Sequence, residues 1–167
     1  ILEVAERVDY FGEIVEPLSD AEIARVVDEV AALEPEAVSV CLNFSFVNNS
    51  HERKLEEALR QKLPNIPIYL SCDVNPEIEE YPRANTTAIA GYLGPIIDKY
   101  ILHLEHDLSE NGVTAPLRLM RSDGGMSTPR AARTNPATMM LSGPAGGVIA
   151  SEYLGSRLGV GNLVTFD

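Results

Sequence analysis

The feature that most limits how this chain can fold is a nearly continuous apolar run at residues 37–42, Ala-Val-Ser-Val-Cys-Leu. A run without polar alternation is typical of a strand that is buried on both faces of a parallel sheet. Residues 66–71 form a second short apolar run, and Pro67 near its start suits a strand end or a sheet edge. Both runs are therefore predicted to be strands.

Amphipathic segments separate the apolar runs. Ser19 and Glu22 have the spacing of a capping box, in which the two side chains satisfy free N–H groups at a helix start. The helix that follows carries apolar residues at helical spacing and is expected to end at Pro35. The remaining predictions are two short strands around a turn at Gly12, helices at 51–63, 83–108 and about 145–158, and strands at 117–120 and 163–166.

Strands that alternate with helices indicate an α/β fold. We expect a layered, mostly parallel sheet with flanking helices, and we treat residues 1–167 as a single α/β domain. The chain opens without Met and closes on Asp167, directly after a strand-like segment. This suggests a fragment of a larger protein, because natural domains usually end in polar, mobile tails.

The acidic balance limits the classes of partner. A formal net charge of -12 argues against nucleic acid, whose phosphates need clustered Lys and Arg, and against an anionic membrane surface. No apolar stretch has the length of a membrane span. Cys41 and Cys72 do not make a disulfide framework, and no local pattern supports a catalytic thiol at Cys72. These features predict a reduced, cytoplasmic protein.

The first candidate site follows the predicted strand at 117–120. In open α/β sheets, ligands bind beyond the carboxyl ends of strands. Asp123 would project from such an end, and Gly124 and Gly125 would let a ligand approach the backbone. The alternative is a plain turn, because Asp-Gly is a common turn dipeptide.

The second candidate site is the glycine-rich stretch that opens the last predicted helix. It contains Ser142, Gly143, Gly146 and Gly147, and free N–H groups at a helix start can bind a phosphate. The stretch is neither a Walker A loop nor a Gly-x-Gly-x-x-Gly fingerprint. The alternative is close packing of the helix on the sheet.

Charged side chains elsewhere give weaker signals. Arg83 follows Glu77, Glu79 and Glu80, so it could hold an anionic substrate, although a solvated helix cap with a salt bridge explains the pattern better. His103 and His106 have a spacing that could share a metal, but no third ligand is evident. We predict surface or partly buried histidines, His51 included, and no metal site.

Several stretches resemble the middle part of the sequences of the hydantoinase A / 5-oxoprolinase family. They occur in the same order as in that family and cover nearly the whole chain. The most specific is Leu-Ser-Gly-Pro-Ala-Gly-Gly-Val at 141–148. The others are 119–126, 163–167, 37–42 with His51 and Glu52, 76–81, Arg83 with Thr86 and Thr87, and 92–95.

The resemblance implies more than the composition does. The family is similar to actin-like ATPases of ribonuclease H-like fold, in which two lobes hold ATP between Asp-x-Gly-Gly-Thr phosphate loops. Asp167 would open the second loop, near Mg-bound phosphates. The parent protein is then expected to use ATP and Mg²⁺, with neither expected bound to the fragment. Asp123 and the stretch from Ser142 to Gly147 become candidates for lining the cleft.

The resemblance also implies an activity. Family members open a cyclic amide such as 5-oxoproline or a hydantoin, after a phosphoryl group has activated the amide oxygen, and many act with a B-type chain. We expect a piece of an ATP-dependent cyclic-amide hydrolase that is inactive alone. The alternatives are a fragment of an acetone carboxylase-type subunit, a non-catalytic docking domain that uses the apolar stripe at 89–104, and a free-standing nucleotide-binding domain.

Overall fold

The computed structural model describes residues 1–166, and Asp167 lies outside the described residues. The chain divides into two compact units, Ile1–Ile96 and Ile97–Asp167. The interpretation of the whole chain as one domain stays a prediction, and each unit is described by itself. Among the described residues, no helix combines the length and the apolar character that crossing a membrane requires.

The centre of the first unit is a parallel pair of short strands, β3 (Val38–Val40) and β4 (Ile68–Leu70). Val38 pairs with Ile68 and Val40 with Leu70. Helix α1 (Asp20–Ala32) precedes β3, and helix α2 (Ser50–Lys62) connects β3 to β4. This β-α-β order confirms that the two apolar runs are parallel strands.

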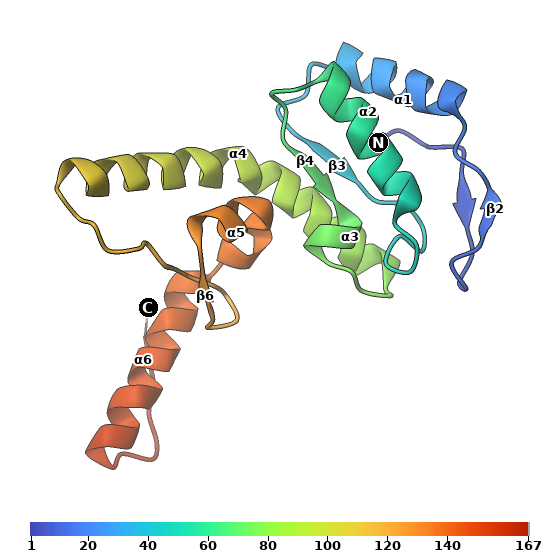
Figure 1. Cartoon of the computed structure of the whole chain (residues 1–167). Coiled ribbons are helices and arrows are strands. Elements are labelled where there is room, and N and C mark those ends of the chain that lie inside the picture. Colours follow the sequence, from blue (N-terminus) through green and yellow to red (C-terminus); the bar gives the residue numbers. More distant parts are fainter. Residues whose placement is uncertain (167) are drawn as a thin grey trace. The chain divides into compact units, whose positions relative to one another are not determined.

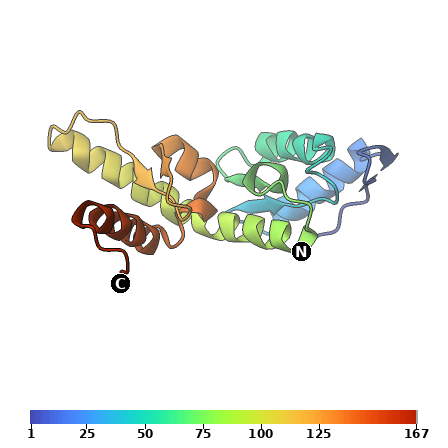
Figure 2. The ribbon, with the colours of Figure 1, turned by 90° about the horizontal axis from the view of Figure 1, so that it is seen from below.

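The two faces of this strand pair are covered by different helices (Figures 1 and 2). Val40, Ile68 and Leu70 point to one face, where they form a core with apolar side chains of α1 and α2. Because side chains alternate along a strand, Ser39 and Tyr69 point to the other face. There they meet the first part of helix α4 (Glu80–Glu110), which approaches closely through Gly91 and Gly94.

Short elements complete the first unit. β1 (Arg7–Val8) and β2 (Ile14–Glu16) form an antiparallel hairpin, and Gly12 takes the predicted turn position with a φ of +85°. A four-residue helix, α3 (Ser71–Val74), follows β4 directly. The capping box is half confirmed: Ser19 Oγ accepts a hydrogen bond from Glu22 N, whereas the Glu22 carboxylate accepts from Ala5 N and Arg25.

The second unit contains the end of α4, an antiparallel hairpin of β5 (Leu119–Met120) and β6 (Met126–Ser127), and three further helices. These are α5 (Pro129–Thr134), the 3-10 helix η1 (Pro136–Met139) and α6 (Ser142–Leu158). Its buried core is small and consists of Ile101, Leu119 and Ala132, with a few partly buried apolar neighbours.

Two expectations about the fold are wrong. The described residues contain three separate two-stranded sheets, of which only β3–β4 is parallel, so the sheet is not mostly parallel. Residues 163–166 form no strand, since no neighbouring strand offers them a ladder of hydrogen bonds within the described part of the chain. The last predicted helix is confirmed, with its first residue at Ser142 and its last at Leu158.

Candidate functional site

The carboxyl ends of β3 and β4 meet at a cluster of buried polar side chains. We call Ser45, Glu52, Ser71 and Arg83 the carboxyl-edge cluster. Ser45 lies in the loop after β3, Glu52 on α2, Ser71 directly after β4, and Arg83 in the first turn of α4. All four are buried, and Glu52 and Arg83 are only 0% and 1% exposed. This edge is where open α/β sheets bind ligands.

Glu52 organises the cluster as an acceptor. Its Oε1 accepts from Leu42 N at 2.9 Å and from Ser71 Oγ at 2.6 Å, and its Oε2 accepts from Cys72 N at 3.0 Å. Ser71 Oγ is also within 2.9 Å of Ser45 Oγ. One carboxylate therefore satisfies the backbone at the end of both parallel strands.

Arg83 holds the same strand end from the opposite side. Its Nη2 donates to Leu42 O and its Nη1 to Glu77 O, both at 3.0 Å, and the guanidinium lies 5.3 Å from the centre of the Phe46 ring. Its Nε has no hydrogen-bond partner among the described residues. The predicted solvated salt bridge is wrong, because Arg83 is buried on carbonyl groups and an aromatic ring instead.

This arrangement suits positioning rather than bond breaking. Both oxygens of Glu52 accept hydrogen bonds, and Glu52 and Arg83 together bind the N–H and the C=O of one residue, Leu42.

Cys72 is also poorly suited to catalysis. Burial, and next the Glu52 carboxylate, raise the pKa of its thiol from 9.0 to about 12, so the reactive thiolate is scarce at neutral pH. The lack of evidence for a catalytic thiol in the sequence agrees with this.

His51 departs from its prediction as a surface or partly buried residue. Its ring is buried, Nδ1 lies 2.6 Å from Glu6 Oε2, and Nε2 accepts from Leu18 N at 3.4 Å. These bonds join α2 to the N-terminal segment and to the residue that precedes the N-cap of α1. The burial of His51 and Glu52 could have been predicted from the sequence, because helical spacing places both on the same face of α2 as Leu55 and Leu59.

The first predicted site is a hairpin turn. Residues 121–125 connect β5 to β6, and Gly124 has a φ of +83°, which a glycine tolerates best. Asp123 Oδ1 accepts from Gly125 N at 2.9 Å, while Oδ2 pairs with Arg121 at 2.5 Å. The segment therefore forms a turn, and the premise that it follows a parallel strand is wrong. Its part in ligand binding stays a prediction.

The second predicted site is the beginning of a helix. Leu141 precedes α6 with a φ of +57°, and no side chain caps the first turn. Gly143 and Gly147 are exposed, and a methyl group added to either would meet nothing within 4 Å. Neither glycine is therefore needed for close packing, and a methyl group added to Gly146 would lie at an ordinary contact distance of 3.6 Å from Met120.

The structure brings the two predicted sites to neighbouring elements. Gly146 faces Met120 of β5, and a methyl group on Gly124 would collide with Ile149 of α6. The hairpin turn and the helix start thus belong to one local assembly of the second unit. Asp167, the remaining predicted site residue, lies outside the described residues.

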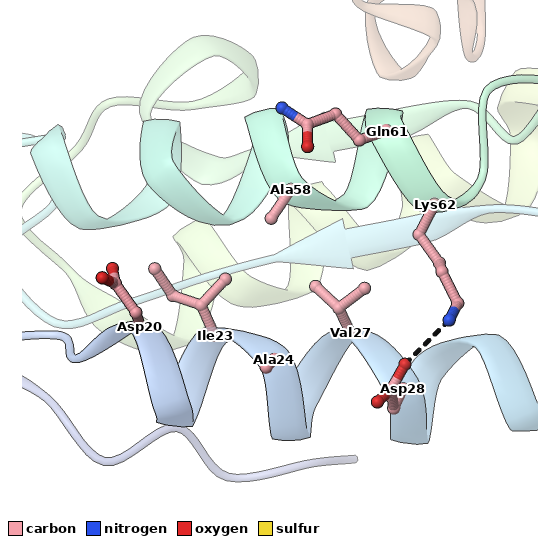
Figure 3. A pocket seen from close by; sticks show the side chains of 8 residues that line it. All are labelled: Asp20, Ile23, Ala24, Val27, Asp28, Ala58, Gln61 and Lys62. Atoms are coloured by element: carbon pink, nitrogen blue, oxygen red, sulfur yellow. Dashed lines mark hydrogen bonds and ion pairs between the residues drawn. The ribbon is translucent and has the colours of Figure 1, made fainter.

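A groove of about 400 Å³ runs between α1 and α2 (Figure 3). Its walls are mostly apolar, with Ile23 and Val27 facing Ala58, and the ion pair between Asp28 and Lys62, at 2.9 Å, spans one end. Polar groups do not converge on it as catalysis would require. The described residues also contain no group of three or more His, Cys, Asp or Glu that could hold a metal ion.

Comparison with known proteins gives consistent matches. The family model "Hydantoinase/oxoprolinase" matches residues 83–167, and that of the "Hydantoinase/oxoprolinase N-terminal region" matches residues 1–63. Caprolactamase subunit alpha of Pseudomonas jessenii is 30% identical over 93% of the chain and 22% of the relative. The chain spans about a quarter of the length of this relative and of two other curated relatives.

Two solved structures resemble the fold. The ATP-dependent caprolactamase from Pseudomonas jessenii has a TM-score of 0.85 and 28% identity, over 93% of this chain and 23% of that one. Acetone carboxylase in a nucleotide-free structure has a TM-score of 0.84 and 29% identity, over 93% and 22%.

Proposed function

Because the chain belongs to the hydantoinase/oxoprolinase family, we propose that it forms part of an ATP-dependent enzyme that opens a cyclic amide of the hydantoin or 5-oxoproline type. The name of the similar caprolactamase, which is described as ATP-dependent, supports this reaction class. Since the chain corresponds to about a quarter of its relatives, the activity is that of a longer protein, and the chain alone is inactive in this proposal.

The main support for this proposal is the start of α6, which has the features of a phosphate-binding site. The first turn of a helix has free N–H groups and a partial positive charge. Here no side chain caps that turn, and the space around Gly143 and Gly147 is open. These observations fit a phosphate of ATP that approaches the backbone through Ser142, Gly143, Gly146 and Gly147.

The neighbouring hairpin turn supplies the proposed second wall. Asp123, Gly124 and Gly125 would line it, with the Asp123 carboxylate held by Arg121 and Gly125 N. Asp167 is proposed to lie near the Mg²⁺ that accompanies the nucleotide. ATP would supply the phosphoryl group that activates the amide oxygen, while these residues position and stabilise charge.

The carboxyl-edge cluster has a separate part in the proposal. Glu52 and Arg83 hold the loop that follows β3, and Glu52 also holds the start of α3 after β4, so these segments would keep one shape while substrate binds in the longer protein. A cytoplasmic location and a hydantoinase B-type partner chain complete the proposal. The subunit names of the caprolactamase and acetone carboxylase relatives support the presence of a partner.

The second candidate function is that of an acetone carboxylase-type subunit, which the TM-score of 0.84 to acetone carboxylase supports. A purely docking role for the stripe at 89–104 has less support, because Ile101 of that stripe is a core residue at 1% exposure. Substrate tests separate the two enzymatic candidates. ATP hydrolysis that depends on 5-oxoproline, hydantoin or caprolactam supports the first, and dependence on acetone with bicarbonate supports the second.

The phosphate site has a direct test in the longer enzyme that contains this chain. Gly143→Asp places a negative charge in the first turn of α6, which favours the helix but repels a phosphate. We expect ATP affinity, measured by calorimetry with Mg²⁺, to fall by about tenfold or more, which corresponds to roughly 1.4 kcal/mol. Ala150→Asp, farther along the same helix and also exposed, is the matched control. Unchanged affinity in Gly143→Asp would remove α6 from the nucleotide site.

A further inference from the structure

Arg83 is a buried cation without a counter-ion. Its side chain takes part in no ion pair within the described part of the chain. Exposed arginines of the same unit differ: Arg25, Arg53 and Arg60 each pair with a carboxylate, although their side chains are about half exposed. A buried charge is normally paired, because its removal from water is costly. Arg83 therefore lacks the partner that its position calls for.

The hydrogen-bond partners of Arg83 are neutral. Its two terminal nitrogens donate to the backbone carbonyl groups of Leu42 and Glu77, and its guanidinium lies against the Phe46 ring. The buried carboxylate of Glu52 accepts from three other donors and does not bond to Arg83. The positive charge is therefore not neutralised by contact with any described carboxylate.

One N–H group of Arg83 is free. Its Nε is buried and has no hydrogen-bond partner among the described residues. A buried donor in a native protein normally has a partner, so a missing one indicates a position that a ligand or an ordered water completes. Arg83 also lies in the first turn of α4, where free backbone N–H groups give the helix a partial positive charge. Both features favour an anionic oxygen at Nε.

Three carboxylates near the start of α4 oppose an anion. Glu77, Glu79 and Glu80 are all exposed, so water and salt screen their charges, whereas the charge of Arg83 is screened much less inside the protein. A single free donor suits one oxygen of a singly charged carboxylate. It suits a phosphoryl group less well, because such a group carries a charge of about -1.5 to -2 and three strong acceptor oxygens.

We propose that Arg83 binds a carboxylate-type oxyanion of the substrate, one oxygen of which accepts a hydrogen bond from Nε. Two sources fit the candidate functions, the carboxylate of 5-oxoproline and bicarbonate. The bonds to Leu42 and Glu77 stay in place, and the partly exposed Phe46 side chain rotates to give access to Nε. This inference deepens the proposed function, on which it rests, because it assigns an acidic substrate instead of a neutral one such as caprolactam.

NMR spectroscopy of the 167-residue chain tests the assignment directly. The Nε–H signal of Arg83 is followed at neutral pH during titration with 5-oxoproline, with bicarbonate and with pyrrolidinone, which has the ring of 5-oxoproline without its carboxylate. We expect a saturable downfield shift with 5-oxoproline or bicarbonate, and the active probe identifies the source. We expect no shift with pyrrolidinone. An equal shift with pyrrolidinone, a shift with inorganic phosphate alone, or no shift with any probe would overturn the proposal.

Two substitutions separate binding from a structural role. Arg83→Lys keeps the positive charge but removes the Nε–H group and the planar guanidinium, so affinity for the active oxyanion should fall by about tenfold or more. Phe46→Leu keeps Arg83 and removes the covering ring, so affinity should rise by about threefold as the cation–π contact is lost. Phe44→Leu, the same change at a neighbouring, partly exposed ring, is the matched control and should have no effect. The proposal is wrong if Arg83→Lys keeps full affinity, or if Phe46→Leu binds no more tightly than Phe44→Leu.

Kinetics of the longer enzyme distinguish this inference from the proposed function. Arg83→Lys should raise the KM for the substrate that supplies the oxyanion by about tenfold and leave the affinity for ATP unchanged. A loss of stability without a change in KM would assign Arg83 a purely structural role and contradict the inference. If the wild-type enzyme opens no cyclic amide while the NMR shift persists, the proposed function fails and the oxyanion site stands.

Discussion

Residues 1–96 and residues 97–166 bury their side chains in different ways. The first unit encloses nine apolar side chains in one core and also buries Glu52, His51 and Arg83, each with hydrogen-bond partners. The core of the second unit contains three buried residues. The first unit therefore has the larger buried core.

Helix α6 shows the difference most clearly. Helices α1 and α2 each turn an apolar face toward β3 and β4 and a polar face outward. In contrast, Val148, Tyr153, Leu154 and Leu158 of α6 are all exposed, the last at 76%. A helix that is apolar around its circumference is normally buried. The apolar faces of α1 and α2 are thus covered within the first unit, whereas these apolar side chains of α6 are not covered by the described residues of the second unit.

The largest expected effect is loss of the buried carboxylate in the first unit. Glu52→Ala leaves Leu42 N, Cys72 N and Ser71 Oγ without their acceptor. We expect a loss of about 3–5 kcal/mol in the free energy of unfolding of residues 1–96, since each buried donor left unpaired costs roughly 1–3 kcal/mol. Urea unfolding followed by hydrogen exchange measures it unit by unit. Glu57→Ala, exposed on the same helix, should change the value by less than about 0.5 kcal/mol.

A smaller loss is expected where α4 touches the strands. Gly94→Ala would place a methyl group 1.8 Å from the Tyr69 hydroxyl, so either the buried Tyr69 ring or the helix must shift. Overpacking of this kind costs about 1–3 kcal/mol. Thermal unfolding of the variant measures the loss. Wild-type stability in Gly94→Ala would show that the first unit is packed more loosely than described.

A glycine-to-alanine substitution should be stabilising, not destabilising, in the second unit. Gly147→Ala meets no neighbour within 4 Å and lies inside α6. Ala is favoured over Gly in a helix by about 0.8–1.0 kcal/mol, so the helix should become more protected against hydrogen exchange. A loss of protection would mean that α6 is already packed against a surface, which contradicts the contrast between the units.

The smallest effect is expected at the surface. Lys62→Ala removes the ion pair with Asp28, in which both side chains are more than half exposed. Exposed pairs contribute about 0–1 kcal/mol, so chemical unfolding should detect a change near zero. A loss comparable to that of Glu52→Ala would show that the stability of the first unit depends on its surface charges rather than on its buried ones.

Much of the fold could be predicted from local patterns. The helices at 51–63 and 83–108 were located within three residues of Ser50–Lys62 and Glu80–Glu110. The strands at 37–42 and 66–71 were also found, because their apolar runs and helix caps are local signals. The resemblance to the hydantoinase A / 5-oxoprolinase family was confirmed by the family models.

The site was harder to predict. Asp123 was placed at a strand end without knowledge of which strand would pair with it, and an antiparallel partner made the segment a turn. Arg83 and His51 were expected near solvent because charged side chains usually are, yet both are buried. Their burial depends on carbonyl and carboxylate partners that lie 41 and 45 positions away in the sequence.

The sequence by itself determined the family, the acidic character and the order of helices and strands, because these follow from residue identity and from periodicity within a few turns of chain. The tertiary structure alone decided which strands pair and which charged side chains are buried. Those outcomes depend on contacts between distant segments, where the cost of removing a charge or a peptide group from water is offset only by a partner brought there by the fold.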